Sequence, residues 1–240
     1  MQWLLDYYRS AVGRKMAMAI TGVLLFLYVF AHMLGNLQIF IPIPPGQEPA
    51  INVYAWFLHS HPVLLWVARV VMGSALLVHV LAATQLTLGT WKARPVGYAK
   101  RKYRAADLAA RTMVWSGPVI GLFLIYHILH LTVGVVGPEK ALAVTNAFAR
   151  ENGVVSLDCY HNVVAGFKVW WISAIYGVAI FLLFLHFWHG LWSWFQTLGW
   201  SHPAHDTARR WFGRGLALLI LIGDLSIPIA VLLGGIKEGV

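Results

Sequence analysis

The sequence predicts an all-α fold, an integral membrane bundle of five transmembrane helices that forms a single membrane domain over residues 1–240. Three observations predict it. Hydrophobic residues make up 59% of the chain and charged residues 11%, a balance typical of membrane proteins. Five stretches reach the length of about 20 apolar residues that a bilayer requires. The basic residues gather in the segments between these stretches.

The five expected spans contain almost no charge. They run roughly over residues 16–41, 62–90, 112–136, 169–198 and 215–236. Pro62 suits the first turn of the second helix, where a missing N–H costs nothing. Only Arg69 and Asp224 place a formal charge inside a span. The first span is too long for a cleavable signal peptide and has no obvious small-residue cleavage site.

The basic residues also predict the orientation of the chain in the membrane. Three clusters lie before the first span, between the second and third, and between the fourth and fifth, whereas the remaining segments carry few. The positive-inside rule therefore places the N-terminus inside and the C-terminus outside. Because topology accounts for most of the net charge of +9, we expect no nucleic-acid partner. The basic surface could also dock a soluble partner or anionic membrane lipids.

The two expected outer loops, residues 42–61 and 137–167, contain the breakers "PIPPG" and "GPEK" and are expected to hold short amphipathic pieces. Cys159, in the second of these loops, is the only cysteine. An internal disulfide is therefore impossible, and no thiolate metal site is expected.

Histidines inside the spans are the main functional signal. Six of the eleven histidines lie there: His32, His79, His127, His130, His186 and His189. One such histidine is usually a packing residue, but histidines on four successive spans indicate function, since polar groups inside a membrane are costly.

These histidines fall at two depths. His32 and His127 each lie about ten residues before the outer end of a span, and His79 and His186 each lie about 18 residues after the outer start of one. A faint repeat supports the first pair, because "TGVLLFLYVFAH" and "SGPVIGLFLIYH" place a hydroxyl residue and a glycine at the same offsets before His32 and His127. The two levels are about 12 Å apart along the helices.

Two histidines from two helices at one level could bind a haem iron from both faces. Bis-imidazole ligation fills both axial positions and suits electron transfer rather than oxygen chemistry. A zinc site is a weaker interpretation, because zinc usually takes three or four ligands at one level. The pattern therefore predicts two haems, stacked through the membrane.

The stretches "RKMAMAITGVLLFLYVFAHMLGNLQ" and "FLHFWHGLWSW" resemble the dihaem cytochrome b anchor of succinate:quinone oxidoreductases and fumarate reductases, in its single-subunit, five-helix form. The resemblance covers all five spans and is weaker in the second and fifth. It implies that His32 and His127 bind the distal haem, and that His79 and His186 bind the proximal haem.

The resemblance also implies a place in respiratory complex II, in a prokaryotic cytoplasmic membrane. The expected reaction is electron transfer between an iron–sulfur subunit and membrane quinone, with menaquinone favoured. The flavin and the succinate or fumarate chemistry would belong to a separate flavoprotein subunit, because this chain has no dinucleotide fingerprint. A higher oligomer of the complex is left open.

Two further histidines in the spans are second-choice ligands. His130 and His189 each lie one helical turn from a proposed ligand, so the helical face alone does not exclude them. The shared glycine-to-histidine spacing favours His127 over His130, whereas His186 is preferred to His189 mainly through the resemblance. As residues that do not bind iron, His130 and His189 are expected to pack, bond a haem propionate or lie near quinone.

Six other polar residues are weaker candidates. Arg69 would pair with a distal haem propionate, snorkel to the surface or pair with Asp224. Asp224 is the only acid in a span and could serve a proton path, a quinone site or a structural pair. Asn36 and Gln38 could bond a propionate or quinone, although helix-end bonding is slightly preferred. His202 and His205, on the inner side, are weak quinone candidates and more simply loop residues.

Two other functions stay open at this stage. The chain could be the dihaem cytochrome b of another quinone-linked complex, such as a hydrogenase or formate dehydrogenase. It could instead be a haem-free transporter or channel that uses membrane histidines to move protons.

Overall fold

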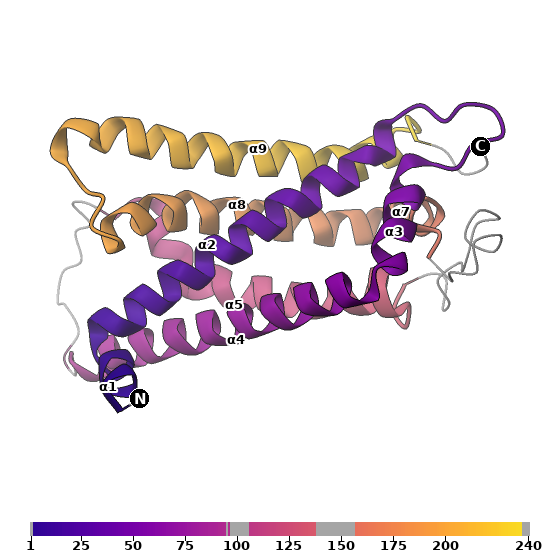
Figure 1. Ribbon diagram of the computed structural model, residues 1–240. Coiled ribbons are helices and arrows are strands. Elements are labelled where there is room, and N and C mark those ends of the chain that lie inside the picture. Colours follow the sequence, from indigo (N-terminus) through magenta and orange to yellow (C-terminus); the bar gives the residue numbers. More distant parts are fainter. Residues whose placement is uncertain (1, 95, 97–105, 138–156, 237–240) are drawn as a thin grey trace. The chain divides into compact units, whose positions relative to one another are not determined.

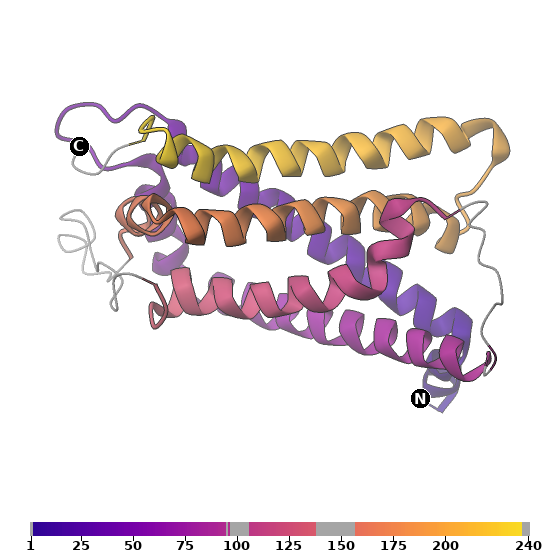
Figure 2. The ribbon, with the colours of Figure 1, turned by 180° about the vertical axis from the view of Figure 1, so that it is seen from behind.

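The computed structural model describes residues 2–94, 96, 106–137 and 157–236 of the chain, and the described regular structure is helical. Figure 1 labels the helices, and Figure 2 shows them from behind. Within this part of the chain, five helical stretches are long and apolar enough to cross a membrane. They are Ala11–Phe40, Pro62–Lys92, Leu108–Val133, Trp170–Thr197 and Pro203–Leu232.

The predicted helical class is thus confirmed, together with five helices long and apolar enough to cross a membrane, but several helix ends differ from the expected span ends. The first stretch begins at Ala11 instead of residue 16 because the helix α2 (Ala11–Asn36) continues past the apolar segment to include Arg14 and Lys15. The long aliphatic stems of these residues tolerate an apolar surface while their charges reach water. Helix bounds follow backbone hydrogen bonding and caps, which need not coincide with the edge of an apolar run.

Helix caps account for most of the other differences between the expected span ends and the observed helix ends. Helix α5 (Leu108–Ile128) begins before residue 112 because Asp107 Oδ1 accepts a hydrogen bond from Ala110 N at 2.9 Å. The following π-helical turn η2 (Leu129–Val133) ends at Gly134, whose φ of +75° suits glycine. Helix α9 (Asp206–Leu232) begins earlier than residue 215 and includes a polar first turn.

The remaining bounds agree closely with expectation. Helix α4 (Pro62–Lys92) begins at the predicted proline, and α8 (Trp170–Thr197) occupies the expected fourth span. Short helices α3 (Ala50–Ser60) and α7 (Cys159–Lys168) lie within the two loops where such pieces were predicted. The other short elements are α1 (Gln2–Arg9), η1 (Leu37–Phe40) and η3 (Pro203–His205).

The chain forms two compact units. Unit 1 comprises Met1–Val29, Arg69–Ser116 and Leu185–Ala217, and unit 2 comprises Phe30–Ala68, Gly117–Phe184 and Leu218–Val240. Each long helix contributes residues to both units. The prediction of one domain, with the N-terminus inside and the C-terminus outside, stays a prediction.

Small residues dominate the helix contacts of unit 1. Ala75, Ala82 and Ala109 are buried, and they allow helices to approach closely without a large hydrophobic core. A side chain at Gly213 of α9 would lie 3.3 Å from Leu191 Cβ of α8, so this glycine allows a close approach of the two helices. Phe26 and Phe187 fill the wider gap between α2 and α8 as an edge-to-face pair at 5.2 Å.

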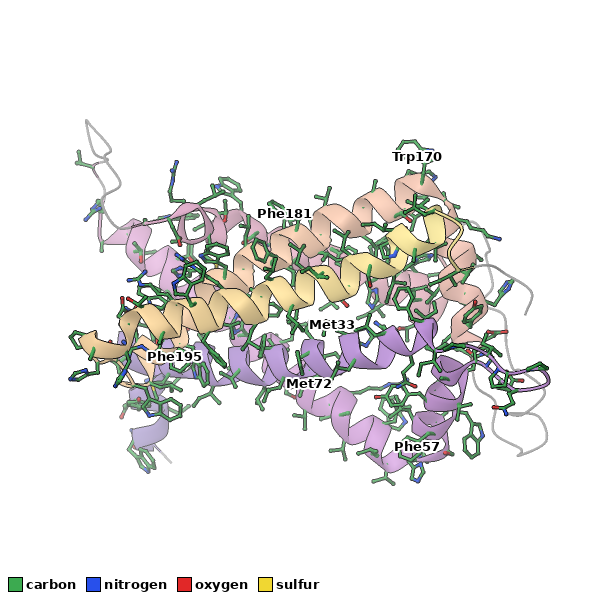
Figure 3. The ribbon with its side chains drawn as sticks, turned by 90° about the horizontal axis from the view of Figure 1, so that it is seen from above. Met33, Phe57, Met72, Trp170, Phe181 and Phe195 are labelled. Carbon is green, nitrogen blue, oxygen red and sulfur yellow. The ribbon has the colours of Figure 1, made fainter. Side chains whose placement is uncertain are left out.

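Unit 2 has a larger apolar core. Ile172, Tyr176 and Ile180 of α8 and Ile227 and Val231 of α9 belong to it. Met33 of α2, labelled in Figure 3, is 1% exposed and lies against Gly223 of α9, where a side chain would collide with its sulfur. Trp170, by contrast, projects outward at the start of α8 and is 72% exposed. Many other large apolar side chains are exposed, as expected for helices that contact lipid.

A polar contact joins two of the short helices in unit 2. Asn52 of α3 is 1% exposed, and its Nδ2 donates to Asp158 Oδ1 at 3.0 Å. Asn52 Oδ1 accepts from Tyr160 N at 2.9 Å, and Asp158 Oδ1 also caps α7 by accepting from His161 N. Helices α3 and α7 are in contact (Figure 1). In addition, η1 contacts α3 and η2 contacts α7.

Cys159, the first residue of α7, was expected in an ordinary loop and instead begins a helix. Burial and the neighbouring Asp158 carboxylate raise the pKa of its thiol to about 11. The thiol is therefore protonated at neutral pH, with little of the thiolate that acts as a nucleophile.

We predict that Asn52→Ala lowers the free energy of unfolding by about 1–3 kcal/mol, because the change leaves the Asp158 carboxylate and the Tyr160 N–H without their buried partner. Thermal unfolding of the purified protein in detergent measures this effect. Gln47→Ala, at an exposed position, is the control and should change little. Equal destabilisation by the two changes would contradict this role of Asn52.

Candidate site: two histidine pairs

The first histidine pair lies in unit 1. His79 of α4 and His186 of α8 have ring centroids 6.3 Å apart, with an angle of 57° between the ring planes. Both rings are partly buried. Two imidazoles from different helices thus face a common region of unit 1, as the depth argument expected.

The backbone of α2 orients His79. Its Nδ1 lies 3.0 Å from Met18 O and 3.3 Å from Thr21 Oγ1. The carbonyl can only accept, so Nδ1 carries the proton and the neutral ring keeps a lone pair on Nε2. Thr21 Oγ1 donates its own proton to Ala17 O at 2.7 Å and can therefore accept from His79.

Gly22 completes the contact with His79. A Cβ at this position would lie 3.2 Å from His79 Cε1, which is closer than ordinary van der Waals contact. The hydroxyl and glycine of the first repeat segment therefore contact the histidine of another helix, His79, instead of only preceding His32. Sequence reasoning noticed this dipeptide but missed its partner.

His186 has a different environment. Its Nδ1 is buried and has no hydrogen-bond partner among the described residues. The hydroxyl of Ser116, the second repeat's equivalent of Thr21, is also buried without a partner in the described part of unit 1. A buried nitrogen without a hydrogen-bond partner costs free energy. The described part of the protein chain therefore leaves the bonding of His186 incomplete.

The second histidine pair lies in unit 2. His32 of α2 and His127 of α5 have ring centroids 5.8 Å apart and nearly perpendicular ring planes, at 86°. His32 is an exposed residue and His127 a partly buried one, so each residue keeps some open surface. Phe123 stacks beside His127, with centroids 5.9 Å apart.

His130 is enclosed by protein. It is 4% exposed, and Cβ atoms built at Gly137 and Gly166 would each approach its ring to 2.9 Å. Tyr126 stacks on the same ring at a centroid distance of 5.6 Å. A planar cofactor needs an accessible ring nitrogen, so this enclosure favours His127 over His130 as a ligand.

Tyr176 connects the two histidines of α5 and η2. Its hydroxyl lies 3.2 Å from His127 Nδ1 and 2.9 Å from His130 Nδ1, and the residue is 4% exposed. Sequence reasoning missed Tyr176 because an aromatic residue in an apolar helix carries no sign of which histidine it faces.

His189 lines a small pocket of unit 1. Asp107, Trp188, Trp192, Arg210 and Arg214 line this pocket with it. The Arg210 and Arg214 guanidinium groups stack over Trp192 and Trp188 at 4.0 and 4.7 Å. Trp188 Nε1 donates to Asp107 Oδ2 at 3.2 Å. The role of His189 stays a prediction.

The weaker candidates are spread over both units. Arg69 is an exposed residue of α4 in unit 1. Asp224 is a partly buried residue of α9 in unit 2 and forms no hydrogen bond or ion pair with another described residue of that unit. Their mutual pairing stays a prediction.

The remaining polar candidates lie near helix ends. Asn36 ends α2 and its side chain does not cap η1, in which Gln38 lies, so the preferred helix-end role for Asn36 is not seen. His202 caps η3, because its Nδ1 accepts from Ala204 N at 3.2 Å. His205 ends η3, and its ring lies 5.9 Å from that of His202.

No group of three or more histidine, cysteine, aspartate or glutamate residues in the described ranges is arranged to hold a metal ion. The histidines instead occur as two pairs. This arrangement does not match the three or four protein ligands of a typical zinc site.

We predict that Gly166→Ala destabilises the protein by about 1–3 kcal/mol relative to Gly177→Ala, because only the first change forces a methyl group against the His130 ring. At Gly177 the nearest atom to a new Cβ is 3.7 Å away. Both changes replace a helical glycine, so their propensity effects cancel. Thermal unfolding in detergent compares them, and equal midpoints would contradict the tight packing around His130.

No family model, curated protein or solved structure matches this chain. A functional assignment therefore depends on the geometry of the two histidine pairs and on the resemblance seen in the sequence.

Proposed function

We propose that this chain is the dihaem cytochrome b membrane anchor of a succinate dehydrogenase or fumarate reductase, and that each histidine pair binds one b haem. The observation that carries the proposal is the pairing itself. His79 with His186, and His32 with His127, come from different helices and have centroid separations of 6.3 and 5.8 Å.

These separations fit a haem iron with two axial imidazoles. Because a metal–imidazole bond is about 2 Å long and the ring centre lies about 1 Å behind the nitrogen, the two centroids should be roughly 6 Å apart. The interplanar angles of 57° and 86° are compatible with this, since each ring can rotate about its bond to the iron. The hydrogen bond at Nδ1 of His79, which leaves the lone pair of Nε2 free, adds support in the pair of unit 1.

The protein residues have distinct roles in this proposal. Haem with two imidazole ligands supplies a one-electron carrier that has no open position for oxygen. Met18 and Thr21 hold the His79 ring in the tautomer that leaves Nε2 free. Gly22 leaves room for that ring, and the Phe26–Phe187 pair fills the neighbouring space in unit 1 and excludes water.

The resemblance extends the proposal to partners and location. An iron–sulfur subunit would exchange electrons with the proximal haem, a flavoprotein subunit would perform the dicarboxylate chemistry, and membrane quinone, with menaquinone favoured, would be the other electron carrier. The complex would lie in a prokaryotic cytoplasmic membrane. Asn36, Gln38, His202, His205 and Asp224 remain the quinone or proton-path candidates, and Arg69 remains the propionate candidate.

Single substitutions test the assignment of each pair. We predict that His79→Ala or His186→Ala removes one of the two haems and leaves the other. We predict that His32→Ala or His127→Ala removes the haem that the first two variants keep. The reason is that a b haem is held only by its ligands and by packing. Dithionite-reduced spectra with redox titration of the purified protein separate the two. Each variant should lose about half of the b-type absorbance.

His189→Ala is the matched control for His186→Ala, because the two residues lie one turn apart on α8. The control should keep both haems. Loss of a haem in His189→Ala with retention in His186→Ala would contradict the inner pair. Subunits that copurify with the wild-type chain distinguish complex II from a hydrogenase or formate dehydrogenase.

A further inference from the structure

A tyrosine hydroxyl bridges one proposed ligand and one histidine to which the proposed function assigns no haem. Tyr176 Oη lies 3.2 Å from His127 Nδ1 and 2.9 Å from His130 Nδ1, all within unit 2. The tyrosine is held in place by edge-to-face contacts with Phe123 and Phe167 at 4.9 and 4.7 Å. Its hydroxyl is therefore a fixed point between two imidazoles.

The Tyr176 hydroxyl has one proton, which limits the possible directions of its two hydrogen bonds. A phenol donates one proton and accepts on the same oxygen, so it can donate to one Nδ1 and accept from the other. If His127 is to offer the lone pair of Nε2, its own proton must lie on Nδ1 and point to Tyr176. The Tyr176 hydroxyl must then donate to Nδ1 of His130.

The packing around His130 makes it a suitable final acceptor. Gly137 and Gly166 approach its ring so closely that neither position has room for a side chain, and Gly137 has a φ of +125°, which favours glycine. Tyr126 stacks on the ring at 5.6 Å. A ring held on these sides cannot readily turn its Nδ1 away from Tyr176.

We infer that Tyr176 is a positioning residue for the outer haem ligand, within a directed chain from His127 Nδ1–H to Tyr176 Oη–H to His130 Nδ1. This inference rests on the proposed haem function. It assigns Tyr176 a role in setting the haem potential and gives His130 the role of anchoring the tyrosine. A hydrogen bond accepted from the ligand's Nδ1–H makes the imidazole a better electron donor, which stabilises oxidised iron.

The test compares Tyr176→Phe with Tyr126→Phe in the purified haem-containing complex. The Tyr126 hydroxyl is buried and has no hydrogen-bond partner among the described residues, and its ring also contacts His130 and Tyr176. The control therefore removes a buried phenol oxygen from the same aromatic cluster without breaking the bridge. Redox titration of the haem absorbance gives the midpoint potential of each haem.

Tyr176→Phe should shift the outer haem to a higher midpoint potential and leave the inner haem unchanged, whereas Tyr126→Phe should shift neither. Loss of the outer haem in Tyr176→Phe alone, with the inner haem retained, would also support the positioning role. An unchanged outer potential in Tyr176→Phe, or equal shifts in the two variants, would overturn it.

A second variant tests the role of His130. His130→Gln keeps an acceptor for the Tyr176 hydroxyl, so it should retain both haems and an outer potential closer to wild type than that of Tyr176→Phe. Loss of the outer haem in His130→Gln with its retention in His127→Ala would overturn the assignment, because His130 would then be the ligand. Failure of the underlying haem function would look different, since the wild-type chain would show no b-type spectrum.

Discussion

An imidazole inside an apolar helix needs a hydrogen-bond or metal partner for each ring nitrogen, and this requirement organises both units of the chain. In unit 1 the backbone carbonyl of Met18 accepts a hydrogen bond from His79 Nδ1–H. In unit 2 the Tyr176 hydroxyl lies within hydrogen-bond distance of Nδ1 of both His127 and His130. In the proposed function, His79 and His127, whose Nδ1 atoms are hydrogen-bonded, use Nε2 to bind iron, so the cofactor completes the bonding that the chain begins at these two rings.

Glycines determine where these rings can lie. Gly22 admits the edge of His79, while Gly137 and Gly166 enclose His130. The two histidines of the α5–η2 segment thereby acquire different roles although they lie one turn apart. His127 keeps some open surface and pairs with His32, whereas His130 is buried and its Nδ1 lies 2.9 Å from the Tyr176 hydroxyl. Small residues thus contribute to the chemistry of the site as well as to helix packing.

The helices and the histidine pairs could be predicted because they depend on patterns that lie along the chain. Long apolar runs indicate spans, and counting residues from the ends of those runs matches His32 with His127 and His79 with His186 in depth. The contacts of Thr21, Tyr176 and Asn52 could not be predicted, because they depend on how each helix is rotated about its axis. Helix starts at Ala11, Leu108 and Asp206 also differed, since helices extend beyond the apolar run to positions set by caps and charged stems.

The haem content of the purified wild-type chain, together with its reduced-minus-oxidised spectrum and redox titration, tests the central claim most directly. The account predicts two b haems per chain, both low-spin and hexacoordinate, that titrate as separate one-electron centres. A membrane preparation of the folded protein with no b-type absorbance, or with a single haem per chain, would contradict it.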